Sequence, residues 1–309
     1  ITNYLDLKKE DFYQVETTVR GKNYITARGW EDLSAMILLY EEEGMKVEES
    51  LVEQYIRNPR VVKEFTAYYD LYQKYRKDYH IEAILTGNAP AEAGEKARKA
   101  GFDERLSLMG MLIDYVQHEI KDNIEKLDYI SNVLVHMKAL KNMLAQGDAS
   151  ADGMRDMLGR QIEGRQKGME ALQKAGSLSD REKRKQRNVI RFLSDCEKTL
   201  RMEGLPDGEA VLGLLREKYE EEVTAYKQET KATGEKLHYL FSFVEDTFGS
   251  GNEMLVLLTE CTVNQDSAKF ISMYGSEDYR RHNEEMMITE RNDILMQQIE
   301  ALDEGEGMF

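Results

Sequence analysis

The feature that most constrains the fold is a run of apolar residues spaced three and four apart between Leu106 and Leu144. Ten of its twelve positions are apolar, and only Asn123 and Lys141 interrupt the stripe. Such spacing is typical of helices in coiled coils and long bundles, where a buried Asn can fix the register. About 40 residues at ~1.5 Å each would extend roughly 60 Å. The pattern therefore predicts one long helix that packs against others along this stripe.

Two further stretches, 189–200 and 223–244, repeat the same spacing. Breaks are expected where glycines gather, at residues 147–153, 176–179 and 204–206. Long helices joined by short breaks pack up and down beside one another. Three shorter helices are predicted after the glycines at 249–251, over 253–263, 266–274 and 277–301.

Composition supports an all-α fold and narrows the cellular compartments in which we expect the protein. The chain of 309 residues has three prolines, which is few for a residue that ends helices. Its net charge of −16 would repel nucleic acid and anionic membranes. The two cysteines, Cys196 and Cys261, cannot make a disulfide framework, and the longest apolar run, 35–40, is too short to span a membrane. We expect a cytoplasmic protein that binds neither nucleic acid nor membrane.

The sequence divides into two helical domains around one linker. Residues 1–85 predict a small helical bundle, with an irregular or hairpin-like entry over 1–27 and helices near 30–40, 51–56 and 60–79. Residues 86–100 have small side chains and almost nothing to bury, so they are the best candidate linker. Residues 101–309 predict an elongated bundle of long antiparallel helices. The first 86 residues carry about −4 and the remainder about −12.

Few residues suggest chemistry. The phosphate-binding loop Gly-x-x-x-x-Gly-Lys-Ser/Thr is absent. Only Glu235 and His238 have the spacing of half a di-iron motif, and an exposed pair on a charged helix is the favoured interpretation. Cys196 and Cys261 lie on apolar stripes, which favours buried structural thiols over a nucleophile. We therefore expect no catalytic residue and no metal ligand in this chain.

Two other groups of residues are interpreted as structural. The aromatic residues of 65–79 follow the period of one helix face, which favours packing over base stacking: Phe65, Tyr68, Tyr69, Tyr72, Tyr75 and Tyr79. The basic run from Arg181 to Arg191 is expected to form a solvated face or salt bridges within its acidic domain. Protein docking or nucleic-acid binding by this run are weaker alternatives.

The segment Tyr24-Ile-Thr-Ala-Arg-Gly-Trp-Glu-Asp-Leu-Ser34 resembles the start of the lid in MoxR-type AAA+ ATPases. In that family the lid opens with an arginine, the second sensor, that reaches the nucleotide phosphates. Arg28 matches that position, with Ala27 where the family often has proline. An arginine offers phosphate a fixed fork of donors. The resemblance implies that Arg28 is a cofactor-binding residue and that residues 1–85 form the lid.

Two later segments, 241–255 and 264–275, are similar to the C-terminal helical extension of bacterial members of this ATPase group. The family's nucleotide core is missing from these residues, so we expect a piece of a longer oligomeric protein that is inactive alone. The resemblance implies ATP and Mg²⁺ in the full-length protein and none held by this chain. It also implies partners: the protein's own AAA+ core, neighbouring subunits and a protein client with a von Willebrand type A domain.

The leading hypothesis is thus a lid and partner-binding region that couples nucleotide state to a protein client in a chaperone-like ATPase. The alternative is a free-standing helical scaffold without ATPase activity. A third hypothesis is a metal-dependent helical-bundle enzyme around Glu235 and His238.

Overall fold

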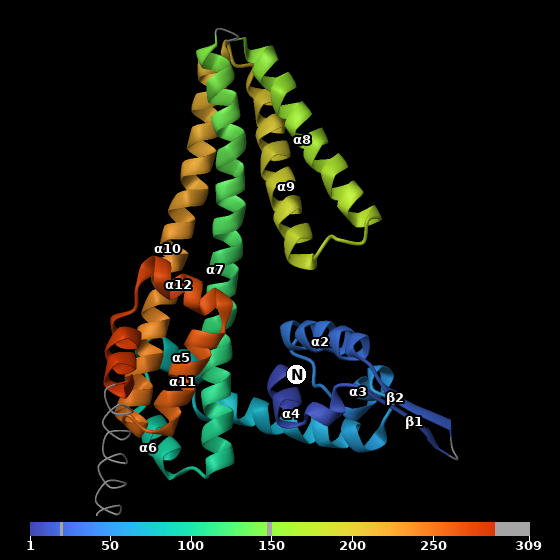
Figure 1. Ribbon diagram of the computed structural model, residues 1–309, viewed down its shortest axis with the longest axis vertical. Coiled ribbons are helices and arrows are strands. Elements are labelled where there is room, and N and C mark those ends of the chain that lie inside the picture. Colours follow the sequence, from blue (N-terminus) through green and yellow to red (C-terminus); the bar gives the residue numbers. More distant parts are fainter. Residues whose placement is uncertain (19–20, 147–149, 288–309) are drawn as a thin grey trace, which may run out of the picture. The chain divides into compact units, whose positions relative to one another are not determined.

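The computed structural model describes residues 1–18, 21–146 and 150–287 (Figure 1). Helices dominate the described residues, which confirms the predicted all-α class. The chain forms two compact units. The first comprises residues 1–112 with 246–248, and the second comprises residues 113–245 with 249 onward. Each unit is described below by itself.

The first unit opens with a short helix and a β-hairpin, followed by a group of helices. Strands β1 and β2 pair antiparallel, with Gln14 opposite Ile25, as the hairpin-like entry predicted. The elements are α1 (Thr2–Leu7), the 3-10 turn η1 (Lys9–Asp11), β1 (Gln14–Thr18), β2 (Gly21–Ile25), α2 (Ala27–Glu42), α3 (Glu49–Tyr55), α4 (Pro59–Asp78), α5 (Ile81–Leu85) and α6 (Ala91–Lys99).

The core of the first unit gathers around aromatic side chains. Phe65 of α4 is 1% exposed, and its ring lies edge-on to those of Tyr4 and Trp30, at 5.3 and 5.2 Å between centroids. Tyr79, at the end of the same helix, is fully buried. The packing interpretation of this aromatic series is therefore confirmed for its two buried ends. Helix α4 begins at Pro59, whose missing N–H is harmless at that position, and Asn58 caps it.

The predicted linker 86–100 contains helix α6, and Ala93 and Ala97 of that helix are buried. Lys96 pairs with Asp78 at 2.8 Å, and its ammonium lies 4.7 Å from the centre of the Tyr79 ring. Small side chains thus allow close packing here, whereas their composition suggested a segment with little to bury. The boundary between the units falls between residues 112 and 113, inside helix α7.

The second unit is built on long helices. They are α7 (Phe102–Ala145), α8 (Ala151–Lys174), α9 (Asp180–Glu203) and α10 (Gly208–Phe248), followed by α11 (Asn252–Val263), α12 (Gln265–Tyr274) and helical residues 277–287. The long helix predicted from the 3.5-residue stripe is α7, with 44 residues. Figure 1 shows α7 and α10 side by side, and α8 and α9 as an antiparallel pair. The rest of the helix predicted over 277–301 lies outside the described residues.

Helices α7 and α10 meet at a buried polar layer. The Asn123 amide donates to Thr233 Oγ1 at 2.8 Å, and its oxygen accepts from Thr230 Oγ1 at 2.9 Å. The second amide hydrogen is satisfied by the Glu119 carbonyl at 2.9 Å. All three side chains are less than 10% exposed. Asn123 therefore lies in the seam as predicted, and its partners permit one register between the two helices.

Within the described part of the chain, no helix is both long enough and apolar enough to cross a membrane.

Candidate functional site

Arg28 lies in the first turn of α2, two residues after Thr26, which caps the helix. Thr26 Oγ1 accepts a hydrogen bond from the backbone N–H of Gly29 at 3.0 Å, so the helix start is fixed. The Arg28 side chain is 86% exposed. Its ion pair among the described residues is with Asp32, one turn later, at 3.6 Å and with both groups in water. An exposed pair of this kind holds an arginine weakly.

The opposite face of α2 is held firmly. Trp30 is 2% exposed, and its indole N–H donates to the backbone carbonyl of Asp11 at 3.0 Å. Gly29 is equally constrained, because a Cβ there would lie 2.7 Å from the carbonyl oxygen of Tyr55. The helix start therefore packs directly on the end of α3. Only a residue without a side chain fits at this position.

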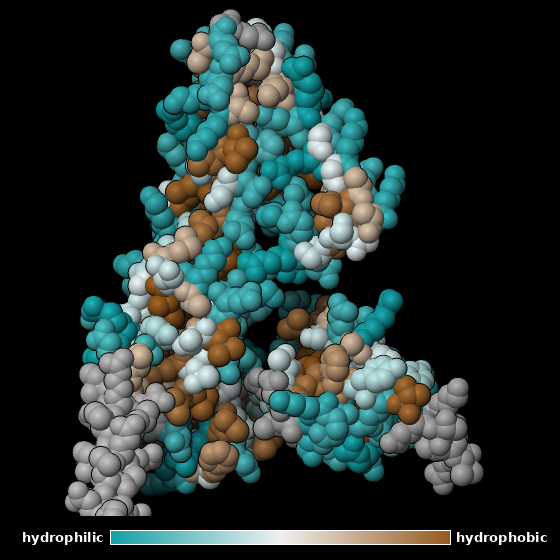
Figure 2. Space-filling view, viewed as in Figure 1, coloured by the Kyte–Doolittle hydropathy of each residue, from teal (hydrophilic) through white to brown (hydrophobic). Residues whose placement is uncertain are grey.

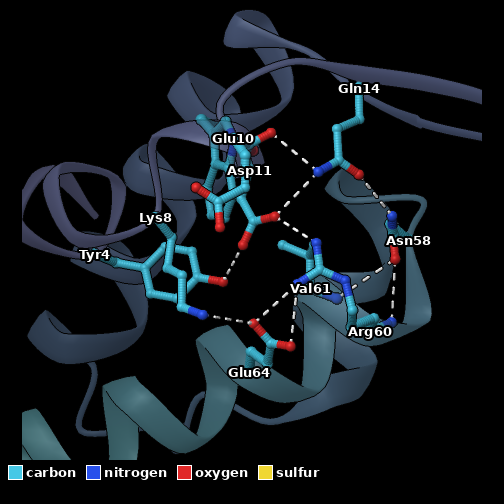
Figure 3. Close-up of polar contacts among 10 residues, drawn as sticks. Tyr4, Lys8, Glu10, Asp11, Gln14, Asn58, Arg60, Val61 and Glu64 are labelled. Carbon is cyan, nitrogen blue, oxygen red and sulfur yellow. Dashed lines mark hydrogen bonds and ion pairs between the residues drawn. The ribbon is translucent and has the colours of Figure 1, made fainter.

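Behind Trp30 lies a buried polar cluster centred on the Asp11 carboxylate (Figure 3). Asp11 is fully buried and accepts from the Tyr4 hydroxyl at 2.7 Å, from Gln14 Nε2 at 3.1 Å and from Arg60 Nη2 at 2.6 Å. Asn58, the cap of α4, donates to Gln14 Oε1 at 3.0 Å. The cluster thus joins α1, η1, β1 and the start of α4.

The electrostatics of the cluster fit a structural role. Burial, followed by the hydrogen bond to Asp11, raises the pKa of the Tyr4 hydroxyl well above its usual range. The hydrogen bond to Asp11 is also the main reason that the pKa of Arg60 is raised. Every polar atom of the carboxylate therefore has a donor, and the group is not poised to react.

Arg28 has the donors that a phosphate needs. It donates no hydrogen bond to another described residue, and its guanidinium projects from a helix whose buried face is fixed. Phosphate accepts two parallel N–H groups of a guanidinium well. This chain lacks the Walker loop that would hold the rest of a nucleotide, so Arg28 could supply only one contact to it.

The two residues considered for a metal site, Glu235 and His238, each have a different partner. His238 Nδ1 is hydrogen-bonded to Asp278 at 2.7 Å, and Glu235 pairs with Lys231 at 3.6 Å. No three His, Cys, Asp or Glu side chains among the described residues form a group that could hold a metal ion. Cys196 and Cys261 are both buried, and burial raises the pKa of each thiol to about 12. Such thiols are structural, as predicted.

The basic run of α9 is partly used inside the second unit. Arg181 pairs with Asp266 at 3.0 Å, and Arg184 donates to both oxygens of Glu125 at 2.8 and 3.1 Å. Internal salt bridges, one of the interpretations of this run, are therefore present. They tie α9 to α12 and α7.

The buried polar cluster around Asp11 is not visible in the sequence pattern. Asp11 lies within a polar stretch of the entry segment, and Arg60 is 49 residues away. The one local signal is Asn58-Pro59, which marks a capped helix start. No family model, curated protein or solved structure matches this chain.

Proposed function

We propose that residues 1–85, the larger part of the first unit, are the lid of a MoxR-like AAA+ ATPase, in which Arg28 contacts the phosphates of ATP. The observation that carries the proposal is the position of Arg28. Its backbone is fixed by the Thr26 cap and by Trp30, while its guanidinium is 86% exposed. A rigid helix start with an exposed guanidinium is suited to meet an anion held by another domain.

In this proposal ATP and Mg²⁺ are held by a nucleotide core outside these 309 residues, and the chain alone does not hydrolyse ATP. The second unit, with its long helices, receives a protein client and transmits the movement of the lid. The similarity to MoxR-type ATPases supports a client with a von Willebrand type A domain, a cytoplasmic location and an oligomeric assembly.

Steady-state ATP turnover tests the assignment in a protein that carries this lid together with its AAA+ core. We expect Arg28→Ala to lower turnover about tenfold or more, because one charge-assisted contact to phosphate is worth ~1.5–3 kcal/mol. Arg28→Lys should recover only part of the rate, since a lysine cannot donate in the same fork.

Arg98→Ala is the matched control, because Arg98 is another exposed arginine of the first unit. Its turnover should equal that of the unchanged protein. Equal turnover in Arg28→Ala would reject the sensor role of Arg28.

A further inference from the structure

Charge is unevenly distributed along the chain. The helical pair α8–α9, residues 151–203, has 13 basic and 9 acidic side chains, a net charge of +4. Because the whole chain carries −16, the remaining residues carry −20. On the face drawn in Figure 2, hydrophilic residues dominate the surface over these two helices. The pair is therefore a cationic, solvated part of an acidic protein.

The outer face of α9 concentrates this positive charge. Its cations are spaced four, four and seven residues apart, which places them on one face of the helix: Lys183, Arg187, Arg191 and Lys198. Arg191 and Lys198 are 84% and 70% exposed, and both have the same carboxylate, Asp195, within 4.0 Å. Lys183 and Arg187 have no ion pair within the described residues. Four cations thus have one nearby acid, and we call this set the basic face.

The neighbouring stretch of α10 has the opposite character. Glu217, Glu220 and Glu221 are exposed, and none of them has an ion pair with a described residue. Glu217 and Glu221 are four residues apart and so lie on one side of the helix. We call these three glutamates the acidic face.

The two faces border one groove, of about 440 Å³, at Arg191 of α9 and Glu221 of α10, with Tyr129 and Phe192 also lining it. Its other charged lining residues are Asp195, Lys218 and Glu222. Helices α9 and α10 are joined by the short turn at 204–207, so they run antiparallel and Arg191 and Glu221 lie at a similar distance from the turn. The basic face and the acidic face therefore form two strips that meet at this groove.

We propose that this surface binds a second copy of the same chain. A two-fold axis along the groove would place α9 of each copy over α10 of the other, so that each basic face meets an acidic face. The pairing occurs twice per dimer. The inference goes beyond the proposed function and holds whether or not Arg28 contacts a nucleotide.

Charge complementarity favours a second copy of the chain over a nucleic acid as the binding partner of this surface. A phosphate backbone on the basic face would lie close to Glu221 and Glu222, which line the groove beside Arg191 and whose charges repel it. A second copy instead matches both strips at once. Single exposed pairs are worth at most ~1 kcal/mol and are screened by salt, so the dimer should weaken as ionic strength rises.

Sedimentation velocity of the full chain, at low salt and at about 0.5 M salt, tests the proposal. The basic-face variant is Arg187→Glu with Arg191→Glu, and the acidic-face variant is Glu217→Lys with Glu221→Lys. We expect a salt-sensitive dimer for the unchanged chain. Each variant alone should show a dissociation constant raised at least about tenfold, because like charges now face each other.

Mixing the two variants provides the decisive comparison. One variant then has acidic charge on both strips and the other has basic charge on both, so an equimolar mixture should form a heterodimer. This rescue also shows that both variants are folded. Lys63→Glu with Lys74→Glu makes the same charge change in the first unit and should leave the dimer intact.

Three results would overturn the proposal. They are an unchanged chain that is monomeric at low salt and at about 100 μM, variants that associate as the unchanged chain does, and a mixture that stays monomeric.

Discussion

Asp11 connects several elements of the first unit through buried hydrogen bonds. Its carboxylate is fully buried and satisfied by Tyr4, Gln14 and Arg60, and its carbonyl holds the indole of Trp30. Removing the carboxylate leaves the Tyr4 hydroxyl buried without an acceptor, which costs more than the hydrogen bond itself contributes. Arg60 is half exposed and can turn to water.

Asp11→Ala should therefore lower the free energy of unfolding by ~2–4 kcal/mol. Trp30 is the one tryptophan of the chain, so its fluorescence during urea unfolding reports on the first unit. Asp70→Ala, which removes an exposed acid from α4, is the control and should shift the midpoint little. Equal midpoints for the two variants would contradict the role assigned to Asp11.

Replacing glycine by alanine should have opposite effects on stability at Gly29 and at Gly168. Gly29→Ala places a Cβ 2.7 Å from the Tyr55 carbonyl oxygen and should destabilise the first unit by ~1–3 kcal/mol. Gly168→Ala meets nothing within 4 Å in the exposed part of α8, so it should stabilise that helix by ~0.5–1 kcal/mol. Thermal unfolding of both variants checks the signs. Destabilisation by Gly168→Ala would contradict the geometry of α8.

At this scale the sequence allowed Arg28 to be selected but not Asp11. The helix start around Arg28 depends on residues that are close to it in the sequence, so a local sequence pattern can predict it. The surroundings of Asp11 depend on Arg60, which reaches it only after the chain has folded. The exposure of the Arg28 side chain could not be predicted either, because an arginine at a helix start can pack against the protein or extend into solvent.

Among the elements, the pairing of α7 with α10 is determined by the layer around Asn123. Asn123→Ala should cost ~1–3 kcal/mol, because the buried Thr230 hydroxyl loses its acceptor and the Thr233 hydroxyl keeps only its longer hydrogen bond to Glu119, at 3.4 Å. Replacing all three residues by apolar ones, Asn123→Leu, Thr230→Val and Thr233→Val, removes every unsatisfied group and should restore most of that loss. Urea unfolding followed by circular dichroism compares them. A triple variant weaker than Asn123→Ala would show that the layer is not the source of the loss.

Residues 277–287 are attached to α10 by Arg281, which donates to both oxygens of Glu245 at 2.9 and 2.7 Å. This hydrogen bond is the main reason that the pKa of Glu245 is lowered to about 2. A carboxylate with a lowered pKa stabilises the fold above its unfolded pKa, near ~4.3, and loses this contribution as the pH falls toward 2.

The difference in unfolding free energy between the unchanged chain and Glu245→Gln should accordingly be constant above pH ~4.5 and should shrink between pH ~4.5 and 2. Urea titrations of both proteins at several pH values measure it. A difference that does not change with pH would mean that the Arg281–Glu245 pair contributes nothing to stability.

The helices themselves were largely predictable, because the 3.5-residue stripe of α7 and the glycine breaks around α9 are local signals. Helix α6 was not predicted. Its alanines are only weakly apolar, so the composition of this segment suggested a linker, whereas Ala93 and Ala97 are buried by close packing. Which helices pair with one another also cannot be read from a local sequence pattern. Asn123 is the exception, because a polar residue in an apolar stripe indicated a polar contact in the seam.

For the whole molecule, the division into units differs from the one that composition suggests. The boundary lies inside α7, and residues 246–248 of α10 belong to the first unit. Linkers are recognised in a sequence by breaks in secondary structure, whereas this boundary lies within one uninterrupted helix. The net charge likewise conceals the cationic α8–α9 pair, whose +4 is outweighed by the rest of the chain.

Equilibrium binding of ATP·Mg²⁺ to a protein that joins these residues to an AAA+ core measures whether Arg28 contacts the phosphates of ATP, as we propose. Arg28→Ala should weaken ATP binding about tenfold, equal to ~1.4 kcal/mol, while Arg98→Ala should have no effect. Identical affinities for these two variants would rule out the contact.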